Sequence, residues 1–273
     1  MGVTDILKKK AIQKNKVMTV LATYCLMCFL MVSFEFNNAI KLDIKYIGLI
    51  FVKSTLIYVA WIASFKALKD IPISIYGVLN LSKIIFSIIW GIVLLQETLT
   101  INQIIGTIII IFGLLVLNLK NENKGENENA KKIKTKSVIL VLLSGIFSTL
   151  SGFMDKVLMK DITSGQLQFW FLLFLAIMYI ITIIVKKEKI EPKKLMKNYW
   201  MLILAICLVI GDRLLFNANG ITESKVSVMS LVKQLSVIIT VIAGGIIFKE
   251  KYILYRLGCA IIVIVGVTVV VLN

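Results

Sequence analysis

Long apolar runs separated by short polar breaks dominate the chain. Most runs hold about 20 residues, the length at which a helix crosses a ~30 Å hydrocarbon layer. Apolar and polar positions do not alternate within them, as they would in the strands of a membrane β-barrel. The pattern predicts an all-α integral membrane protein with nine transmembrane helices, at residues 17–38, 46–68, 73–95, 102–119, 137–159, 166–185, 199–219, 226–248 and 253–272.

The polar breaks indicate how the chain is divided. Residues 120–136 form a long low-complexity segment, and this composition predicts a flexible linker between two halves. Residues 186–197 form a second, basic loop. The first sixteen residues carry five lysines and are expected to lie at the membrane surface.

The two halves repeat one another. Adding 153 to a position in residues 74–119 gives its counterpart in residues 227–272 without a gap. Small and charged residues recur at the matched positions: Ser74 with Ser227, Gly91 with Gly244, Glu97 with Glu250, and Gly113 with Gly266. Duplicated apolar helices are typical of membrane transporters. We therefore predict a first repeat of four helices (1–119), a polar linker (120–136) and a second repeat of five helices (137–273).

The helix at 137–159 has no full counterpart in the first half. Its end, FMDKVLMK, resembles VTDILKKK at the start of the chain, with Asp5 opposite Asp155. One hypothesis is that the first helix of the first repeat is missing, either lost or left upstream of a misplaced start codon. The alternative is a genuine chain of nine helices.

The composition agrees with a membrane location, since 59% of the residues are hydrophobic and the mean hydropathy is +0.92. The net charge of +16 comes mostly from lysines in the breaks, which favours a positive-inside pattern over a nucleic-acid surface. Their distribution over alternate breaks predicts a cytoplasmic N-terminus and linker and, with nine helices, an external C-terminus. The expected location is the cell membrane, crossed several times.

The residue types present disfavour several kinds of chemistry. The chain has no histidine, and its four cysteines lie in apolar runs, so Cys25-x-x-Cys28 is interpreted as packing and not as a metal or redox site. Acids do not cluster at metal-ligand spacing, no nucleophile has a partner base, and no GxxxxGK[ST] loop is present. We expect no enzyme activity, no cofactor and no bound metal.

The segment G…QETLTINQIIGTIIIIFG, which begins at Gly91, has a glutamate at a helix end with glycines before and after it, and this layout recurs in the second half. In it the chain resembles the drug/metabolite transporter superfamily, in particular the EamA-type permeases, over residues 17–119 and 137–272. The resemblance implies ten helices in two inverted five-helix repeats, a substrate cavity between the repeats, and transport of a small metabolite. This chain has one helix fewer than that pattern.

Polar residues inside the predicted helices are the candidate substrate-binding groups, because a charge at mid-membrane costs about 2.5–3.5 kcal/mol on insertion scales. The candidates are Lys83, Asp212, Arg213, Lys233, Asn80 and Gln234. The functional interpretation is that they line a polar cavity and contact a solute or a proton. The alternative is a set of buried ion pairs, such as Asp212 with Lys233, that only fixes helix packing. Weaker candidates are Asp155, Lys156 and Lys53, whose long stem can reach an interface.

Two repeated features are interpreted as structural. Glu97 and Glu250 each precede an apolar helix, where a carboxylate satisfies free backbone N–H groups or meets a basic neighbour. Pairs of glycines on one helix leave small faces for close helix contact, within the chain or in a homodimer. These pairs are Gly106 with Gly113 and Gly258 with Gly266.

The leading hypothesis is a secondary transporter that moves a small organic metabolite or drug across the cytoplasmic membrane by alternating access, with protons as the candidate coupling ion. The alternative is a non-transporting membrane scaffold or a subunit of a larger complex, in which the buried charges are purely structural. The expected partners are a small-molecule substrate and the lipid bilayer, and not nucleic acid.

Overall fold

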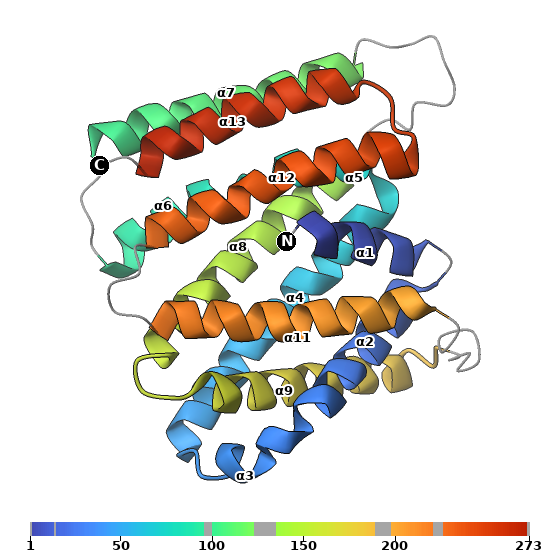
Figure 1. Cartoon of the computed structure of the whole chain (residues 1–273), viewed down its shortest axis with the longest axis vertical. Helices are drawn as coiled ribbons and strands as arrows, with labels where there is room; N and C mark the ends of the chain where they lie inside the picture. Colours follow the sequence, from blue (N-terminus) through green and yellow to red (C-terminus); the bar gives the residue numbers. More distant parts are fainter. Residues whose placement is uncertain are drawn as a thin grey trace. The chain divides into compact units, whose positions relative to one another are not determined.

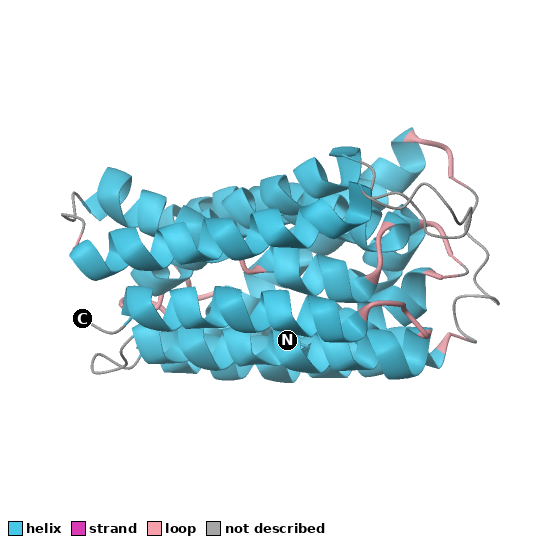
Figure 2. Cartoon of the chain, turned by 90° about the horizontal axis from the view of Figure 1, so that it is seen from above, coloured by secondary structure: helices cyan, strands magenta, loops and turns pink. Residues whose placement is uncertain are grey.

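The computed structural model describes residues 2–13, 15–95, 100–122, 135–188, 198–220 and 226–271. Every regular element in these ranges is a helix, and they contain no strand (Figures 1 and 2). The elements are α1 (Gly2–Ile12), α2 (Val17–Val32), η1 (Ser33–Glu35, a 3₁₀ turn), α3 (Phe36–Ala39), α4 (Ile44–Asp70), α5 (Ile73–Asn80), α6 (Lys83–Leu95), α7 (Ile101–Glu122), α8 (Thr135–Leu158), α9 (Ser164–Val185), α11 (Tyr199–Gly220), α12 (Val226–Phe248) and α13 (Ile253–Val271).

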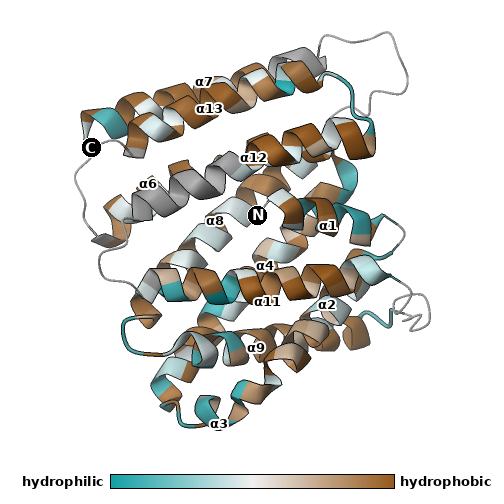
Figure 3. Ribbon diagram, in the orientation of Figure 1, coloured by the Kyte–Doolittle hydropathy of each residue, from teal (hydrophilic) through white to brown (hydrophobic). Residues whose placement is uncertain are grey.

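Apolar residues make up most of these helices (Figure 3). Seven described segments are long and apolar enough to cross a membrane: Val17–Ala39, Ile44–Asp70, Ile73–Leu94, Thr135–Leu158, Ser164–Val185, Tyr199–Ala218 and Ile253–Val270. Two shorter apolar helices, Ile101–Leu117 and Ser236–Phe248, lie within α7 and α12. Each of the nine predicted helices has a counterpart among these segments, so the predicted all-α membrane fold is confirmed.

The structure corrects two details of the prediction. The expected surface segment at the N-terminus forms the helix α1, in which Leu7, Ala11 and Ile12 are buried. The expected helix 73–95 is divided into α5 and α6, because backbone N–H groups around Leu81 bond carbonyls three residues back instead of four. Such bonding tightens a helix locally into a 3₁₀ turn.

The described helices group into two compact units. Unit 1 contains residues 1–6, 66–149 and 225–273, and unit 2 contains residues 7–65 and 150–224. Both α4 and α8 contribute residues to each unit, so each unit takes helices from both halves of the sequence. The predicted division into two repeats joined by a linker at 120–136 concerns sequence ancestry and stays a prediction.

In unit 1, α7 and α13 pack against each other along their length. A Cβ on Gly106 would lie 2.5 Å from the Gly266 carbonyl oxygen, and one on Gly113 would lie 2.6 Å from Val263. As the contacts advance along α7 from Gly106 to Gly113, they retreat along α13 from Val270 to Val263, so the two helices are antiparallel (Figure 1). The predicted close contact is therefore made within the chain by Gly106, Gly113 and Gly266, whereas the expectation for Gly258 is wrong within the chain, because an added Cβ there would meet nothing within 4 Å.

In this contact, one pair of touching residues has a matching pair at the equivalent positions of the other repeat. Gly113 meets Val263, and their repeat counterparts, Gly266 and Ile110, also meet. Contacts that exchange in this way indicate approximate two-fold symmetry. Antiparallel packing of these equivalent helices is the arrangement that repeats of inverted topology require.

Unit 2 is built around α2, which packs against α9 and α11. Its core is aromatic: Phe171 lies edge-on to Trp61 and to Phe216, with ring centroids 6.3 and 6.5 Å apart. Tyr24 is fully buried beside Trp61, with centroids 5.6 Å apart. Aromatic pairs in these geometries stabilise a core beyond the area they bury.

Candidate functional site

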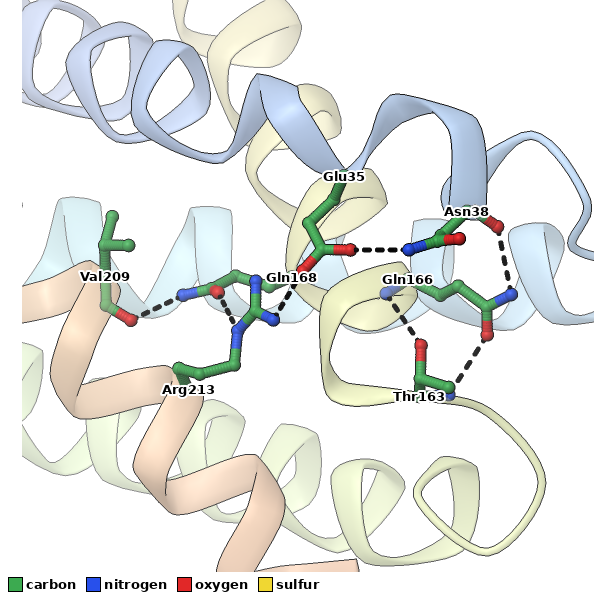
Figure 4. Close-up of polar contacts among 7 residues, drawn as sticks. All are labelled: Glu35, Asn38, Thr163, Gln166, Gln168, Val209 and Arg213. Carbon is green, nitrogen blue, oxygen red and sulfur yellow. Dashed lines mark hydrogen bonds and ion pairs between the residues drawn. The ribbon is translucent and has the colours of Figure 1, made fainter.

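An arginine, a glutamate and a glutamine meet in unit 2 (Figure 4). Arg213 of α11 donates from Nη1 to Glu35 Oε1 at 2.7 Å and from Nε to Gln168 Oε1 at 2.7 Å. Gln168 of α9 in turn donates from Nε2 to the Val209 carbonyl at 2.8 Å. The Arg213 side chain keeps 26% of its surface exposed, against 13% for Glu35. The guanidinium is thus fixed between an acid and an amide while part of it stays accessible.

The local backbone places Glu35 at the start of α9. Glu35 ends the 3₁₀ turn η1, and Asn38 of α3 donates to its Oε2 at 3.2 Å. The Asn38 carbonyl accepts from Gln166 at 3.1 Å, and Gln166 also forms a reciprocal capping box with Thr163 (Figure 4). Gly165 leaves room, since a Cβ there would lie 2.6 Å from the Glu35 carboxylate. The carboxylate therefore lies where the positive end of the α9 dipole favours it.

A second ion pair in unit 2 is more deeply buried. Lys53 Nζ of α4 is 3.0 Å from Asp155 Oδ1 of α8, and the side chains are only 2% and 9% exposed. The ammonium group also lies over the ring of Phe171, 3.5 Å from its centroid. Lys53 is the tenth residue of α4, so it lies ~15 Å along the helix, about half way across a ~30 Å layer. The interpretation that its stem reaches an interface is wrong, because the side chain turns inward and pairs within the core.

Unit 1 holds a third ion pair, between Glu250, just before α13, and Arg256 in its first turn. Glu250 accepts from the backbone N–H groups of Ile73 and Ser74 at 2.6 and 3.2 Å, and the Ser74 hydroxyl also bonds it. Arg256 donates to Glu250 Oε2 at 3.1 Å and to Ser74 Oγ at 2.6 Å. The carboxylate satisfies free N–H groups at the start of α5 and meets a basic neighbour. The structural interpretation of Glu250 is confirmed.

In the second repeat, this arrangement explains why a glycine accompanies the glutamate. A Cβ on Gly244 would lie 2.8 Å from a Glu250 carboxylate oxygen, and the Glu250 N–H donates to the Gly244 carbonyl at 3.0 Å. Glycine is needed so that the carboxylate can approach the helix so closely. The counterpart of Glu250 in the first repeat, Glu97, lies outside the described residues.

The six predicted substrate-binding residues are divided between the two units. In unit 2, Arg213 belongs to the network of Figure 4, and Asp212 precedes it on α11. In unit 1, Asn80 ends α5 and Lys83 begins α6, so they flank the tightened turn. The side chains of Lys233 and Gln234 lie outside the described part of the structure. The pairing of Asp212 with Lys233 therefore stays a prediction.

Two members of the unit 2 network, Glu35 and Gln168, are not among the residues predicted from the sequence to bind substrate. A signal for Glu35 exists, because it is a carboxylate inside the apolar segment Val17–Ala39 and needs a cationic partner. Gln168 gives no such signal, since a neutral amide near a helix start is ordinary. Its role depends on the register between α9 and α11, which only the fold supplies.

Comparisons with known proteins agree with this architecture. The chain matches the EamA-like transporter family over residues 1–119 and 135–272. A crystal structure of a protein superposes with a TM-score of 0.65 at 11% sequence identity, covering 98% of this chain and 95% of that chain. At this identity the likeness shows the fold alone. A comparison with curated protein sequences found no match.

Seven described helices are long and apolar enough to cross a membrane, and two equivalent helices pack antiparallel. These features are those of a multi-pass helical membrane protein. The family match covers both halves of the sequence and omits mainly the segment between them. The chain belongs to the EamA-like transporter family, which places it among the membrane transporters of the drug/metabolite transporter superfamily. The resemblance seen in the sequence is thereby confirmed.

Proposed function

We propose that this protein is a secondary transporter that moves a small organic metabolite or drug across the cell membrane by alternating access. The observation that carries the proposal is the partly exposed Arg213, held by Glu35 and Gln168 between membrane-spanning helices. Charged groups are costly in such segments and usually mark solute or ion pathways. A guanidinium has five N–H donors, so one that is fixed by two partners keeps donors for a polar solute.

The inverted repeats support alternating access. In transporters of this kind, two inverted repeats rock against a binding site near the middle of the bilayer and open it to each side in turn. In the antiparallel contact of α7 with α13, Gly113 and Gly266 make equivalent contacts with the opposite helix, and this supports the symmetry.

Flux through proteoliposomes tests the proposal. A thermal-shift screen of the purified full chain against amino acids, nucleosides, sugars, polyamines and cationic drugs selects the solute. Wild-type protein is expected to transport it saturably, and Arg213→Gln to lose roughly ten- to a hundredfold in rate, because a lost charged hydrogen bond is worth ~1.5–3 kcal/mol. Lys156→Ala, which removes an exposed charge of α8, is the matched control and should transport normally. Wild-type flux in Arg213→Gln would remove Arg213 from the mechanism.

Asp212 is the proposed proton-coupling group, since it is a half-buried carboxylate beside Arg213 on α11. Asp212→Asn is expected to abolish the acceleration of flux by an imposed pH gradient. If an imposed pH gradient does not change the rate of wild-type flux, the protein works by facilitated exchange and Asp212 does not couple transport to protons.

A non-transporting scaffold is the second candidate. The buried pairs Lys53–Asp155 and Glu250–Arg256 favour it, because the first joins α4 to α8, the second ties the start of α13 to the start of α5 through Glu250, and both would be retained for packing alone. Folded protein that carries no solute of the screen across liposome membranes would support the scaffold and contradict the transporter.

A further inference from the structure

The Lys53 ammonium group occupies a site of unusual composition for an internal ion pair. Its Nζ lies 3.0 Å from the Asp155 carboxylate, 3.5 Å from the ring centroid of Phe171 and 5.2 Å from that of Phe216. The four residues come from four helices of unit 2, namely α4, α8, α9 and α11. One carboxylate and two aromatic faces therefore surround a single cation.

These are the groups with which proteins recognise organic ammonium ligands. The electron-rich face of an aromatic ring attracts a desolvated cation, and a carboxylate balances its charge. Neutralising Asp155 would not by itself require the lysine Nζ to lie over a ring. The short distance to the Phe171 centroid shows that the rings contribute to holding the ammonium group.

The aromatic wall extends beyond the part that Lys53 covers. Phe171 continues edge-on to Trp61, which packs against Tyr24. The Tyr24 hydroxyl is buried and has no hydrogen-bond partner among the described residues. A buried hydroxyl left in this state is costly unless another group bonds it. The wall thus offers additional ring surface, and an unused polar group two ring contacts away from the ammonium site.

We propose that Asp155, Phe171 and Phe216 form a binding site for an alkylammonium group, that Lys53 is its resident ligand, and that an incoming organic ammonium ion competes with Lys53 for Asp155. As a binding site it stands apart from transport. That such an ion is also the transported solute rests on the proposed function.

Vacating the site provides the first test. The full chain is purified in nanodiscs, and n-propylammonium chloride is the probe, with sodium chloride and n-propanol as controls for salt and for the alkyl chain. Lys53→Ala is expected to melt at a lower temperature than wild type and to be stabilised by propylammonium more than by either control. Lys53→Ala/Asp155→Asn should lose this response, whereas Lys156→Ala, the neighbouring exposed lysine, should respond as wild type does. Equal responses of Lys53→Ala and the double variant would overturn the proposal.

A second measurement uses wild-type protein and does not depend on the folding of a variant. Tetramethylammonium is the competitor, because it does not react with amine-labelling reagents. If it displaces Lys53 from Asp155, reductive methylation of Lys53 becomes severalfold faster, as read by mass spectrometry of the peptide. Phe171→Leu should weaken this effect. A Lys53 labelling rate that is unchanged up to high tetramethylammonium concentration would contradict exchange.

Binding and labelling are measured without a flux step. A failure to detect flux would therefore not contradict the ammonium site. Absence of ammonium binding would contradict the site but not transport of another class of solute, which the flux assay tests.

Discussion

Two acid–arginine pairs, one in each unit, use the same chemistry differently. In unit 1, Glu250 and Arg256 are 10% and 9% exposed, and both carboxylate oxygens accept hydrogen bonds from N–H groups at the start of α5. In unit 2, Glu35 and Arg213 are 13% and 26% exposed, and an amide shares the guanidinium. The first pair completes a helix end, whereas the second leaves its cation partly accessible. We infer that the contacts around a membrane ion pair, more than its charges, decide whether it stabilises the fold or meets a solute.

Removal of Glu250 should have the largest effect on stability. Glu250→Ala leaves Arg256 buried without its acid and frees the N–H groups of Ile73 and Ser74. Breaking a buried ion pair by removing one partner costs about 3–5 kcal/mol. Near-UV circular dichroism during denaturation in mixed micelles measures the loss. Glu250→Gln, which keeps an oxygen acceptor, should lose less, and a wild-type midpoint for Glu250→Ala would break the contrast between the units.

The glycine contact of unit 1 should give the next largest loss. A methyl group on Gly106 meets backbone of α13, which cannot rotate away as a side chain can. Gly106→Ala is expected to cost ~1–3 kcal/mol, typical of overpacking. Gly258→Ala on α13 is the matched control, because nothing lies within 4 Å of its added Cβ. Equal melting temperatures for the two variants would show that α7 and α13 do not pack as closely as described.

Gly165→Ala sharpens the comparison from the side of unit 2. Its added methyl group would meet the Glu35 carboxylate, the mobile end of a side chain, so the free energy of unfolding should fall by less than ~1 kcal/mol. The displaced carboxylate no longer holds Arg213, so solute flux in proteoliposomes should fall clearly. A large loss of stability with normal flux would reverse the roles assigned to the two pairs.

Asn38→Ala should have the smallest effect. It removes one exposed hydrogen bond to Glu35, of 3.2 Å, worth about 0.5 kcal/mol. The exposed neighbour Asn37 is the control position for the same substitution. A thermal melt of both variants in one detergent measures the difference. A loss of several degrees for Asn38→Ala alone would mean that the Glu35 network stabilises the fold as strongly as the Glu250 cluster.

The fold could be predicted from the sequence because the signal is repeated and local. Apolar runs of membrane-spanning length predict the helices, and the constant spacing between repeats predicts their kinship. The break between α5 and α6 was not predictable in this way, since α12, its counterpart, continues without interruption. Glu250 was interpreted correctly as a structural carboxylate, but the N–H groups that it satisfies begin α5 and not α13, the helix that it precedes in sequence.

The candidate site was only partly predictable, because it depends on contacts between helices far apart in sequence. Arg213 was singled out by its charge alone. Its partners Glu35 and Gln168 come from helices whose register no local pattern specifies. Lys53 was placed at an interface by its long stem, but the fold supplies Asp155 and an aromatic ring inside the core. Charge identifies which residues need a partner, and tertiary packing decides which partner they find.

The exchange of Gly113 and Gly266 across the contact of α7 with α13 has a consequence for assembly. The contact between α7 and α13 is made by side chains and backbone of the two helices, so it does not depend on their belonging to one polypeptide. Separate polypeptides that end after α7 and begin before α8 carry both surfaces, and co-expression of such halves should yield a complex that purifies through a tag on either one.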